Sequence, residues 1–278
     1  MSGMEQYIQA YLTPLEQAID SFTPISLNAL KERAELMERR DNKYVLTTEQ
    51  VLAFLEHAKP KFDVLEIDGL RQFHYLSHYY DSSELTTHAD HNKGRRRRVK
   101  IRHRHYVDSS DHFFEIKLKG RRKLTQKYRI SFNPQDLGSN GLNSELIDYY
   151  CTTLENYYGD ENERNWWLDN LIPSISVGYH RITLVSKTED SRITMDNGIY
   201  FIDSKETSPA TKKSKTYLNN DKWVIEVKSP SGRTDIDRWL FQNKSRPVSL
   251  CSKYAMGINL LKLASVNNRF SMVLRRHF

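Results

Sequence analysis

The chain has 278 residues, of which 38% are hydrophobic and 28% are charged, and its formal net charge is +7. This length suits one large domain or two modest ones. The aromatic content of 11% and the charges of both signs argue against a wholly disordered chain. No uncharged apolar run approaches the ~20 residues of a membrane-spanning helix, so we expect a soluble protein.

The N-terminus and the cysteines favour a cytoplasmic protein. Residues 1–10 include Glu5 and lack the basic and apolar segments of a secretory or mitochondrial leader. Cys151 and Cys251 lie far apart without partners at a metal-ligand spacing. We therefore expect two structural thiols in a reducing compartment.

Hydrophobic periodicity predicts strands enclosed by helices. Ser26 and Thr47 or Thr48 are suitable N-caps for the first two helices. In chain order, the predicted elements are helices over 27–40 and 48–58, strands over 98–105, 113–119 and 123–130, a helix over 143–158, strands over 179–185, 192–196 and 223–228, and a helix over 252–264.

The positive charge is concentrated in one region. Residues 93–129 contain fifteen Lys and Arg against three Asp and Glu, a local charge of +12, which leaves −5 for the rest of the chain. From Arg98 to Arg104 basic residues alternate with Val99, Ile101 and His103, so one face of this strand is cationic. Such a region indicates an anionic partner.

The other predicted strands repeat this pattern. An ordinary antiparallel sheet with one wet face remains the simpler interpretation of any single strand. Taken together, however, like charges on neighbouring strands repel each other unless an anion lies among them. Curling the sheet so that the cations line its interior would form a basic tunnel for a polyanion, with helices covering the outside.

Short motifs in order along the chain resemble those of the VTC domain, the polyphosphate polymerase domain of the vacuolar transporter chaperone complex. This domain belongs to the triphosphate tunnel metalloenzymes, also called CYTH-like proteins. The motifs are ERRDNKYVL (38–46), YYDS (79–82), KIR (100–102), FEIK (114–117), KYR (127–129), YHR (179–181), SRITMD (191–196), IEVK (225–228) and SKY (252–254).

The resemblance implies an α+β fold in which an eight-stranded antiparallel β-barrel forms a tunnel with a cationic lumen, flanked by helices. It implies an N-terminal helical extension over 1–36 and a tunnel domain over 37–278, with a helical insertion at about 141–170. The implied activity is metal-dependent synthesis of inorganic polyphosphate from ATP, with Mn²⁺ or Mg²⁺ as the metal. Inorganic triphosphatase or nucleoside triphosphate hydrolase activity is the alternative within the same fold.

The resemblance also assigns site residues. The tunnel cations and the lysine of the final helix are expected to bind phosphates and promote transfer. Within that set, Arg102, Arg129, Arg181, Arg192 and Lys228 are expected to hold the bound ATP. Glu226 is the expected metal ligand, and Glu38 and Glu115 are carboxylates that hold a second metal or orient a lysine. The full set of cations is Lys43, Lys100, Arg102, Lys117, Lys127, Arg129, Arg181, Arg192, Lys228 and Lys253.

Two positions depart from the family pattern. Lys119 stands where the polymerase has a histidine, and Leu250 stands where it has a second basic residue. We identify neither membrane helices nor a phosphate-sensing module in the sequence. We therefore expect a stand-alone enzyme, with a membrane protein as the partner that receives its product.

Other classes of function stay open. The run Arg95–Arg98 could belong to a nucleic-acid-binding module, but we find no aromatic residues on the cationic strand faces for base stacking, and expect no nucleic-acid partner. A tunnel that only senses polyphosphate is a further alternative. Surface positions rather than metal ligation are predicted for the histidines, namely His74, His78, His88, His91, His103 and His105.

Overall fold

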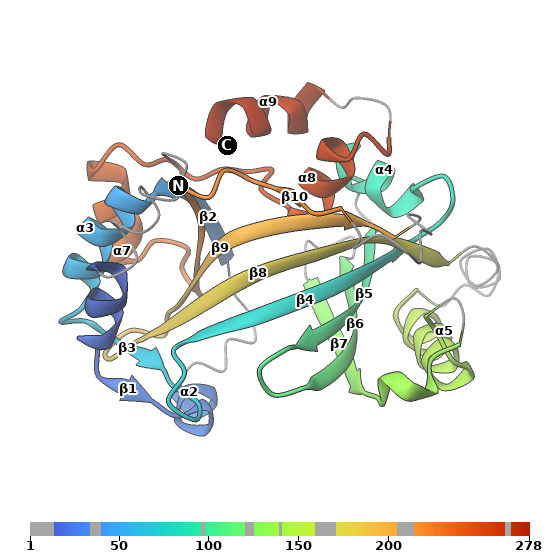
Figure 1. Cartoon of the computed structure of the whole chain (residues 1–278), viewed down its shortest axis with the longest axis horizontal. Helices are drawn as coiled ribbons and strands as arrows, with labels where there is room; N and C mark the ends of the chain where they lie inside the picture. The colour runs from blue at the N-terminus through green and yellow to red at the C-terminus, as the bar shows by residue number, and fades with distance from the viewer. Residues whose placement is uncertain are drawn as a thin grey trace.

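The computed structural model describes residues 14–33, 40–95, 98–119, 125–138, 141–158, 171–204, 214–264 and 268–278. These ranges form a large sheet with helices packed around it (Figure 1), the α+β class that the sequence predicts. Glu38, the expected boundary at 36/37 and residues 159–170 of the expected insertion lie outside them. Within these ranges, no helix combines the length and apolar character needed to cross a membrane.

Strands form the largest class of regular structure in the described residues. They are β1 (Pro24–Ile25), β2 (Arg40–Thr47), β3 (Phe62–Leu65), β4 (Gln72–Asp81), β5 (Arg98–Tyr106), β6 (Asp111–Lys119), β7 (Thr125–Ser131), β8 (Ile172–Ser186), β9 (Arg192–Asp203), β10 (Thr216–Tyr217) and β11 (Lys222–Ser229). The helices are α2 (Leu27–Arg33), α3 (Thr48–Ala58), α4 (Thr86–Asn92), η1 (Pro134–Asp136), α5 (Ser144–Tyr158), α7 (Asp235–Gln242), α8 (Lys253–Leu260) and α9 (Asn268–His277).

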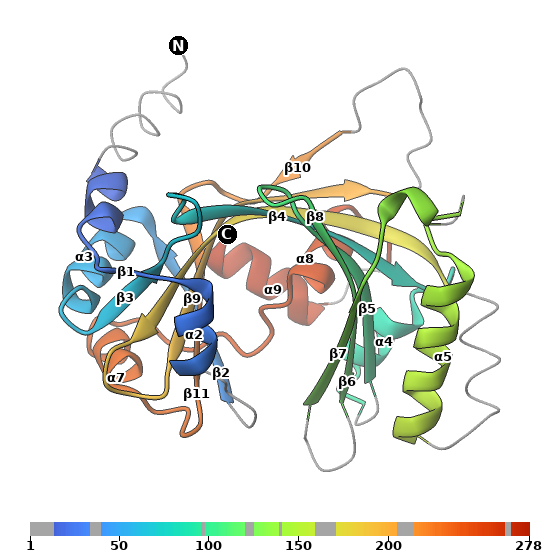
Figure 2. The same cartoon turned by 90° about the horizontal axis from the view of Figure 1, so that it is seen from below.

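The main sheet is an open arch. Eight strands follow the order β2-β11-β9-β8-β4-β5-β6-β7, all paired antiparallel, with β1, β3 and β10 added at the sides. Within the described residues β2 and β7 do not pair, so the predicted closure into a barrel is not observed. Figure 2 shows the two ends of the sheet as separate arms, β2 and β11 in one and β5, β6 and β7 in the other.

The segment that leads into α8 joins the two arms in place of a strand pair. Lys43 Nζ of β2 donates a hydrogen bond to the carbonyl oxygen of Cys251 at 2.9 Å, and Lys100 Nζ of β5 donates to Ser252 Oγ at 2.9 Å. The Cys251 carbonyl and the Ser252 side chain therefore connect one arm with the other.

Most of the predicted helices are confirmed. Thr47 caps α3 in a capping box with Gln50, and the bounds of α3 and α5 match the prediction to within one residue. The prediction of a helix reaching residue 40 is wrong, because Arg40 begins β2. The helix predicted to run to 264 ends at Leu260, since Lys262 adopts a left-handed φ of 57° that stops the last turn.

The helices cover separate parts of the arch. α3 and α7 pack on the outer face of β2, β11 and β9 through residues such as Phe54, Ile225 and Leu240. α5 packs on the outer face of β5 and β6 through Leu146, Ile101 and Ile116. α8 lies on the inner side, where a Cβ on Gly257 would come within 2.6 Å of side-chain atoms of Phe201 and Ile175. Figure 2 shows α8 and α9 inside the arch and the other two groups outside it.

One buried carboxylate fixes α4 and α8 to the sheet. Asp81 at the end of β4 is fully buried. It accepts hydrogen bonds from the backbone N–H groups of Ser82, Thr87 and His88, from Thr87 Oγ1, and from the Tyr254 hydroxyl of α8 at 2.6 Å. The same side chain thus caps the start of α4 and anchors α8.

Replacing Asp81 by Ala should lower the free energy of unfolding by about 3 kcal/mol, because several buried donors lose their acceptor. Urea denaturation monitored by circular dichroism measures this loss. Asp111→Ala is the matched control, because Asp111 is exposed and accepts a hydrogen bond from Ser109 Oγ, and it should change stability by less than about 0.5 kcal/mol. Equal losses in the two variants would contradict the anchoring role.

Candidate active site

Strand periodicity places the basic side chains on the inner face of the arch. On β5, Val99 and Ile101 point outward into the cluster with α5, so the alternating cations point inward. The same holds on β11 and β9, where Ile225 and Ile193 point outward toward α3. We call this inner surface the cationic face; it carries Lys43, Lys100, Arg102, Arg104, Lys117, Lys127, Arg129, Arg181, Arg192 and Lys228 from the strands, and Lys253 from the start of α8.

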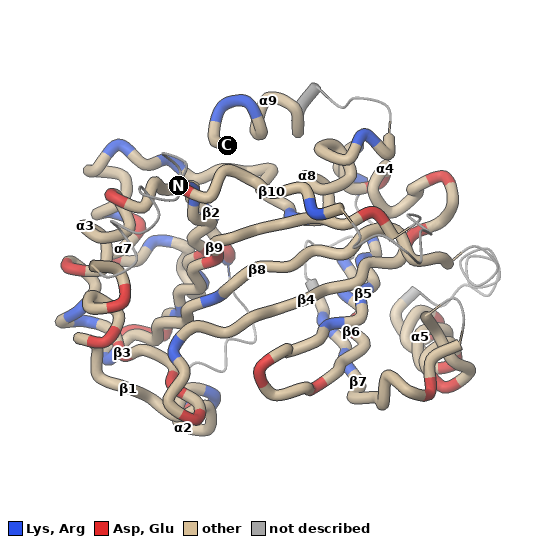
Figure 3. The backbone as a smooth tube through the Cα atoms, viewed as in Figure 1, with Lys and Arg blue, Asp and Glu red and all other residues tan. Residues whose placement is uncertain are grey.

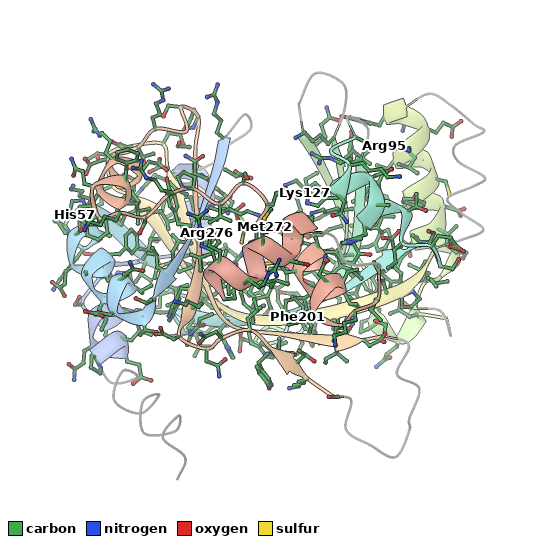
Figure 4. The ribbon with its side chains drawn as sticks, turned by 90° about the horizontal axis from the view of Figure 1, so that it is seen from above. His57, Arg95, Lys127, Phe201, Met272 and Arg276 are labelled. Carbon is green, nitrogen blue, oxygen red and sulfur yellow. The ribbon has the colours of Figure 1, made fainter. Side chains whose placement is uncertain are left out.

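The figures agree with this placement. Figure 3 shows Lys and Arg along β5, β6, β7, β8 and β9, and Asp and Glu largely on the surrounding helices and turns. Figure 4, seen from above, places Lys127 on the arm of β5, β6 and β7, and Met272 and Arg276 on α9 between the two arms. The structure thus gathers all ten predicted site cations on one face, together with Arg104, which the strand periodicity places on the same face.

Three carboxylates on the cationic face make close contacts with these cations, and a fourth, Asp41 of β2, lies directly opposite Lys228. The first is Glu226 of β11, which accepts a hydrogen bond from Lys228 Nζ at 2.7 Å and lies 3.8 Å from Lys43 Nζ. Strand register places Glu226 directly opposite Lys43. Burial alone would raise the pKa of Glu226, but Lys228 and Lys43 hold it well below its usual range.

The second carboxylate is Asp196 of β9, directly opposite Arg181 of β8. It accepts a bidentate pair of hydrogen bonds from Arg181, at 2.6 Å from Nε and 2.8 Å from Nη2, and a further hydrogen bond from Lys253. Burial opposes its charge, yet Arg181 and Lys253 lower its pKa. The planar guanidinium is therefore fixed in one orientation.

The third carboxylate is Glu115 of β6, whose side chain is only 2% exposed. Arg102 Nε donates to it at 2.7 Å, Lys127 Nζ donates at 2.5 Å, and Arg104 Nε lies 3.4 Å away. Burial raises the pKa of Glu115, but these three cations lower it far more. Glu115 thus orients a lysine and two arginines, one of the two roles that the resemblance implies for it.

Tyrosines lie between the cations, which the sequence interpretation missed. Tyr75 and Tyr79 of β4 and Tyr179 of β8 point inward, and the guanidinium carbons of Arg104 and Arg181 lie 5.4 Å and 5.2 Å from the Tyr75 ring centroid. The statement that the cationic face lacks aromatic residues is therefore wrong. These rings are already packed and at most 8% exposed, so they support arginines and present little surface for stacking a base.

Burial, with repulsion from neighbouring cations as a smaller cause, lowers the pKa of several lysines. Burial, with repulsion from Lys43 and Lys117 next in importance, places the pKa of Lys100 well below its usual value. Burial lowers the pKa of Lys127 and of Lys228 to about 8, although Glu115 and Glu226 partly restore it. The cationic face therefore becomes less positive over a range just above neutral pH.

The carboxylates differ in how well they suit a divalent metal. Both oxygens of Glu115 and of Asp196 already accept close hydrogen bonds from cations, so neither fits as a metal ligand. Glu226 fits better, because its side chain is 17% exposed and its Oε1 accepts no close hydrogen bond from the described residues, with Lys43 Nζ 3.8 Å away. Among the described residues no three His, Cys, Asp or Glu side chains converge on one point, so phosphate oxygens and water would complete the coordination shell.

The two positions that depart from the family pattern lie near this face. Lys119 ends β6 opposite Arg98 and Thr125. Leu250 lies two residues before Ser252, and its carbonyl accepts a hydrogen bond from the Ser252 N–H at 3.1 Å.

Some histidine predictions are wrong. His103 and His88 are 7% and 2% exposed, so they are buried rather than on the surface. His88 packs edge-on against Tyr254 at 6.0 Å and hydrogen-bonds with Asn92 between α4 and α8. His103 lies on the outer face of β5, where neighbouring histidines cover it.

The affinity of the cationic face for tripolyphosphate, without metal, should fall as pH rises from 7 to 9. Lys127 and Lys228 lose their charge as pH passes their pKa of about 8, and each loss weakens binding by up to about tenfold. The ligand becomes no less negative over this range, so a fall reports on the protein.

Titration calorimetry at pH 7, 8 and 9 measures this effect, and buffers with different ionisation enthalpies reveal proton uptake on binding at pH 8. Lys228→Arg should weaken the pH dependence, since an arginine stays charged. An affinity that is constant between pH 7 and 9 would show that these lysines do not contact the anion.

Comparisons with known proteins place the chain in a family. The model of the VTC domain matches residues 38–262. Among curated proteins none matches. Similar solved structures include a candidate adenylate cyclase from Bacillus halodurans (10% identity, 76% of this chain and 94% of that chain, TM-score 0.44) and a candidate adenylyl cyclase from Hippeastrum with a dominant triphosphatase activity (12% identity, 84% and 99%, TM-score 0.44).

A third is the PH1819 protein from Pyrococcus horikoshii (11% identity, 81% of this chain and 100% of that chain, TM-score 0.40). Identities and TM-scores this low carry no argument about activity. The family match covers most of the chain, including every described strand of the main sheet. The chain belongs to the VTC domain family.

Proposed function

We propose that this protein transfers the γ-phosphoryl group of ATP to the end of an inorganic polyphosphate chain on its cationic face. The observation that carries the proposal is the distribution of charge on that face. Seven of the eight strands in the main path contribute at least one Lys or Arg to it, and β4 contributes tyrosines. A single phosphate cannot contact so many cations, whereas an extended polyanion can.

The ion pairs described above support this proposal energetically. The cations outnumber Glu226, Asp196 and Glu115, so the face keeps an excess of positive charge in partly buried surroundings. Such an excess is costly unless an anion binds. Because the three carboxylates fix the cations beforehand, an incoming phosphate chain meets donors that need little reorganisation.

Phosphoryl transfer requires in-line placement of the attacking and leaving oxygens and neutralisation of the non-bridging oxygens. A terminal oxygen of the polyphosphate forms a bond to the γ-phosphorus, the bond to the β-phosphate oxygen breaks, and ADP leaves. In our proposal Arg102, Arg129, Arg181, Arg192 and Lys228 hold the phosphates of ATP, and Lys43, Lys100, Lys117, Lys127 and Lys253 neutralise the remaining charge.

A divalent metal would bind through Glu226. When bound, Mn²⁺ or Mg²⁺ supplies further neutralisation of phosphate charge. Lys228 and Lys43 lie beside Glu226 and would repel a metal ion that arrived alone. The negative charge of bound ATP would offset this repulsion. The product could then pass to a membrane-protein partner.

Incubation of the full chain with ATP and Mn²⁺ tests the proposal, with chain length read on gels and free phosphate by colorimetry. Long polyphosphate with stoichiometric ADP is expected. Free phosphate without polymer would instead show triphosphatase activity of the same face. Tight polyphosphate binding without turnover would show a sensor, and RNA binding that polyphosphate does not displace would favour the nucleic-acid alternative.

Arg181→Ala should lower turnover at least 100-fold, because it removes the guanidinium that Asp196 orients. Arg238→Ala is the control, since Arg238 lies on α7 with its side chain 74% exposed and should keep full activity. Thermal unfolding of both variants checks that the fold is intact. Full turnover in a folded Arg181→Ala protein would exclude the cationic face as the active site.

Glu226→Gln should raise the Mn²⁺ concentration that gives half-maximal turnover by at least tenfold, because an amide is a poorer ligand than a carboxylate for a hard cation. The same change leaves Lys228 and Lys43 with a neutral neighbour, so metal-free affinity for tripolyphosphate should hold or increase. Glu66→Gln serves as the control, because Glu66 forms a half-buried ion pair with Arg71 that involves no cation of the cationic face. An unchanged Mn²⁺ requirement would remove Glu226 as the ligand.

A further inference from the structure

Histidines gather on the outer face of the sheet, opposite the cationic face. The strand register places His78 of β4 opposite His103 of β5, and His105 of β5 opposite His112 of β6. Their ring centroids are 5.0 Å and 4.1 Å apart. The proposed phosphoryl transfer uses none of these side chains.

The closest contact in this group joins two imidazole nitrogens. His103 Nε2 and His112 Nδ1 lie 2.8 Å apart in a hydrogen bond, with ring centroids 5.0 Å apart. Phe132 stands edge-on to both rings, at 4.8 Å from His103 and 6.0 Å from His112. His103 is buried and His112 is half-buried, so the pair is rigid on one side and reachable from the other.

The surroundings keep these rings uncharged at neutral pH. Burial, followed by repulsion from His78, His112 and His105, lowers the pKa of His103 to about 3. Burial also lowers the pKa of His112, which Asp111 offsets only in part. Neutral imidazole is the form that binds transition metals, so protons would compete weakly at this position.

We propose that His103 and His112 form a binding site for a borderline transition-metal dication such as Zn²⁺ or Cu²⁺ on the outer face of the sheet. The metal takes the place of the proton shared by Nε2 and Nδ1, and that proton moves to the other nitrogen of the donor ring. Two metal–nitrogen bonds of about 2.0–2.1 Å at a tetrahedral angle place the nitrogens about 3.3 Å apart, so the two rings would move apart from 2.8 Å and turn until both lone pairs point at the metal. Water completes the shell, because no three described His, Cys, Asp or Glu side chains converge there.

Ligand chemistry separates this site from the cationic face. Imidazole favours Zn²⁺ and Cu²⁺, whereas Mg²⁺ and Mn²⁺ prefer oxygen ligands such as carboxylates and phosphates. The His103–His112 site would therefore bind its metal without phosphate, whereas the cationic face would bind a metal together with phosphate. Occupation of the His103–His112 site would link β5 to β6 beside Phe132.

Titration calorimetry of the untagged full chain with Zn²⁺ alone, without phosphate, tests the proposal. One ion per chain is expected, and electron paramagnetic resonance of the Cu²⁺ form should show coupling to two imidazole nitrogens. In His112→Asn the asparagine keeps a polar atom near the position of Nδ1, but an amide is a poor ligand for Zn²⁺. This variant should therefore weaken Zn²⁺ binding at least tenfold. In His103→Gln the side-chain amide lies near the position of Nε2, and this variant should also weaken Zn²⁺ binding at least tenfold.

His57→Gln is the matched control, since His57 lies on α3 and stacks on Trp239, and it should bind Zn²⁺ as the unchanged chain does. Tripolyphosphate affinity without metal should be the same in His112→Asn and the unchanged chain. The proposal is overturned if the unchanged chain binds no Zn²⁺, if His112→Asn and His57→Gln bind it equally, or if the Cu²⁺ spectrum lacks imidazole coupling.

Discussion

Repulsion among like charges on one face of the sheet is the constraint on which the rest of the structure depends. The chain meets it with carboxylates placed directly across the strands, Glu226 opposite Lys43, Asp196 opposite Arg181 and Glu115 opposite Arg102. Each pair joins neighbouring strands of the arch, so the contacts that make the charge tolerable also set the positions of the cations. The carboxylates neutralise only part of the positive charge, and the remaining positive charge is available to bind a polyanion. Stability and binding therefore depend on the same side chains.

The segment from Cys251 to Tyr254 extends this coupling beyond neighbouring strands. It contacts β2 through the Cys251 carbonyl, β5 through Ser252, β9 through Lys253 and β4 through Tyr254, whose ring stacks on Tyr79 at 4.9 Å. Of these four strands only β4 and β5 are neighbours in the sheet order, so the segment connects strands that the ladders of hydrogen bonds do not join directly. Asp81 then holds the segment in place through the Tyr254 hydroxyl. An anion bound on the cationic face would therefore lie beside the segment from Cys251 to Tyr254.

The sequence predicts the cationic strands well, because Val99 and Ile101 alternate cleanly with Lys100 and Arg102 and so reveal which side is buried. β4 could not be assigned in the same way. Both of its faces carry aromatic residues, Tyr75 and Tyr79 on one and His74 and Tyr80 on the other, so the two-residue period gives no contrast. The two-residue period places Asp196 on the same face as Arg192. The contacts of Asp196 with Arg181 and Lys253 depend on the fold and could not be predicted from that period. The missing pairing between β2 and β7 could not be predicted either, because the periodicity of a single strand does not determine which strands pair.

This missing pairing has a consequence for solubility. An unpaired edge strand is a template on which a second chain can add a strand. Within the described residues β7 has such an edge, whereas on β2 the Lys43 carbonyl accepts a hydrogen bond from the Val248 N–H at 2.7 Å. On β7 the side chains of Lys127 and Arg129 are exposed, and β2 begins with the exposed Arg40 and Asp41. Two copies approaching edge to edge through β7 would bring these cations together and repel each other. The charges that attract a polyanion therefore also discourage the protein from aggregating through its own sheet.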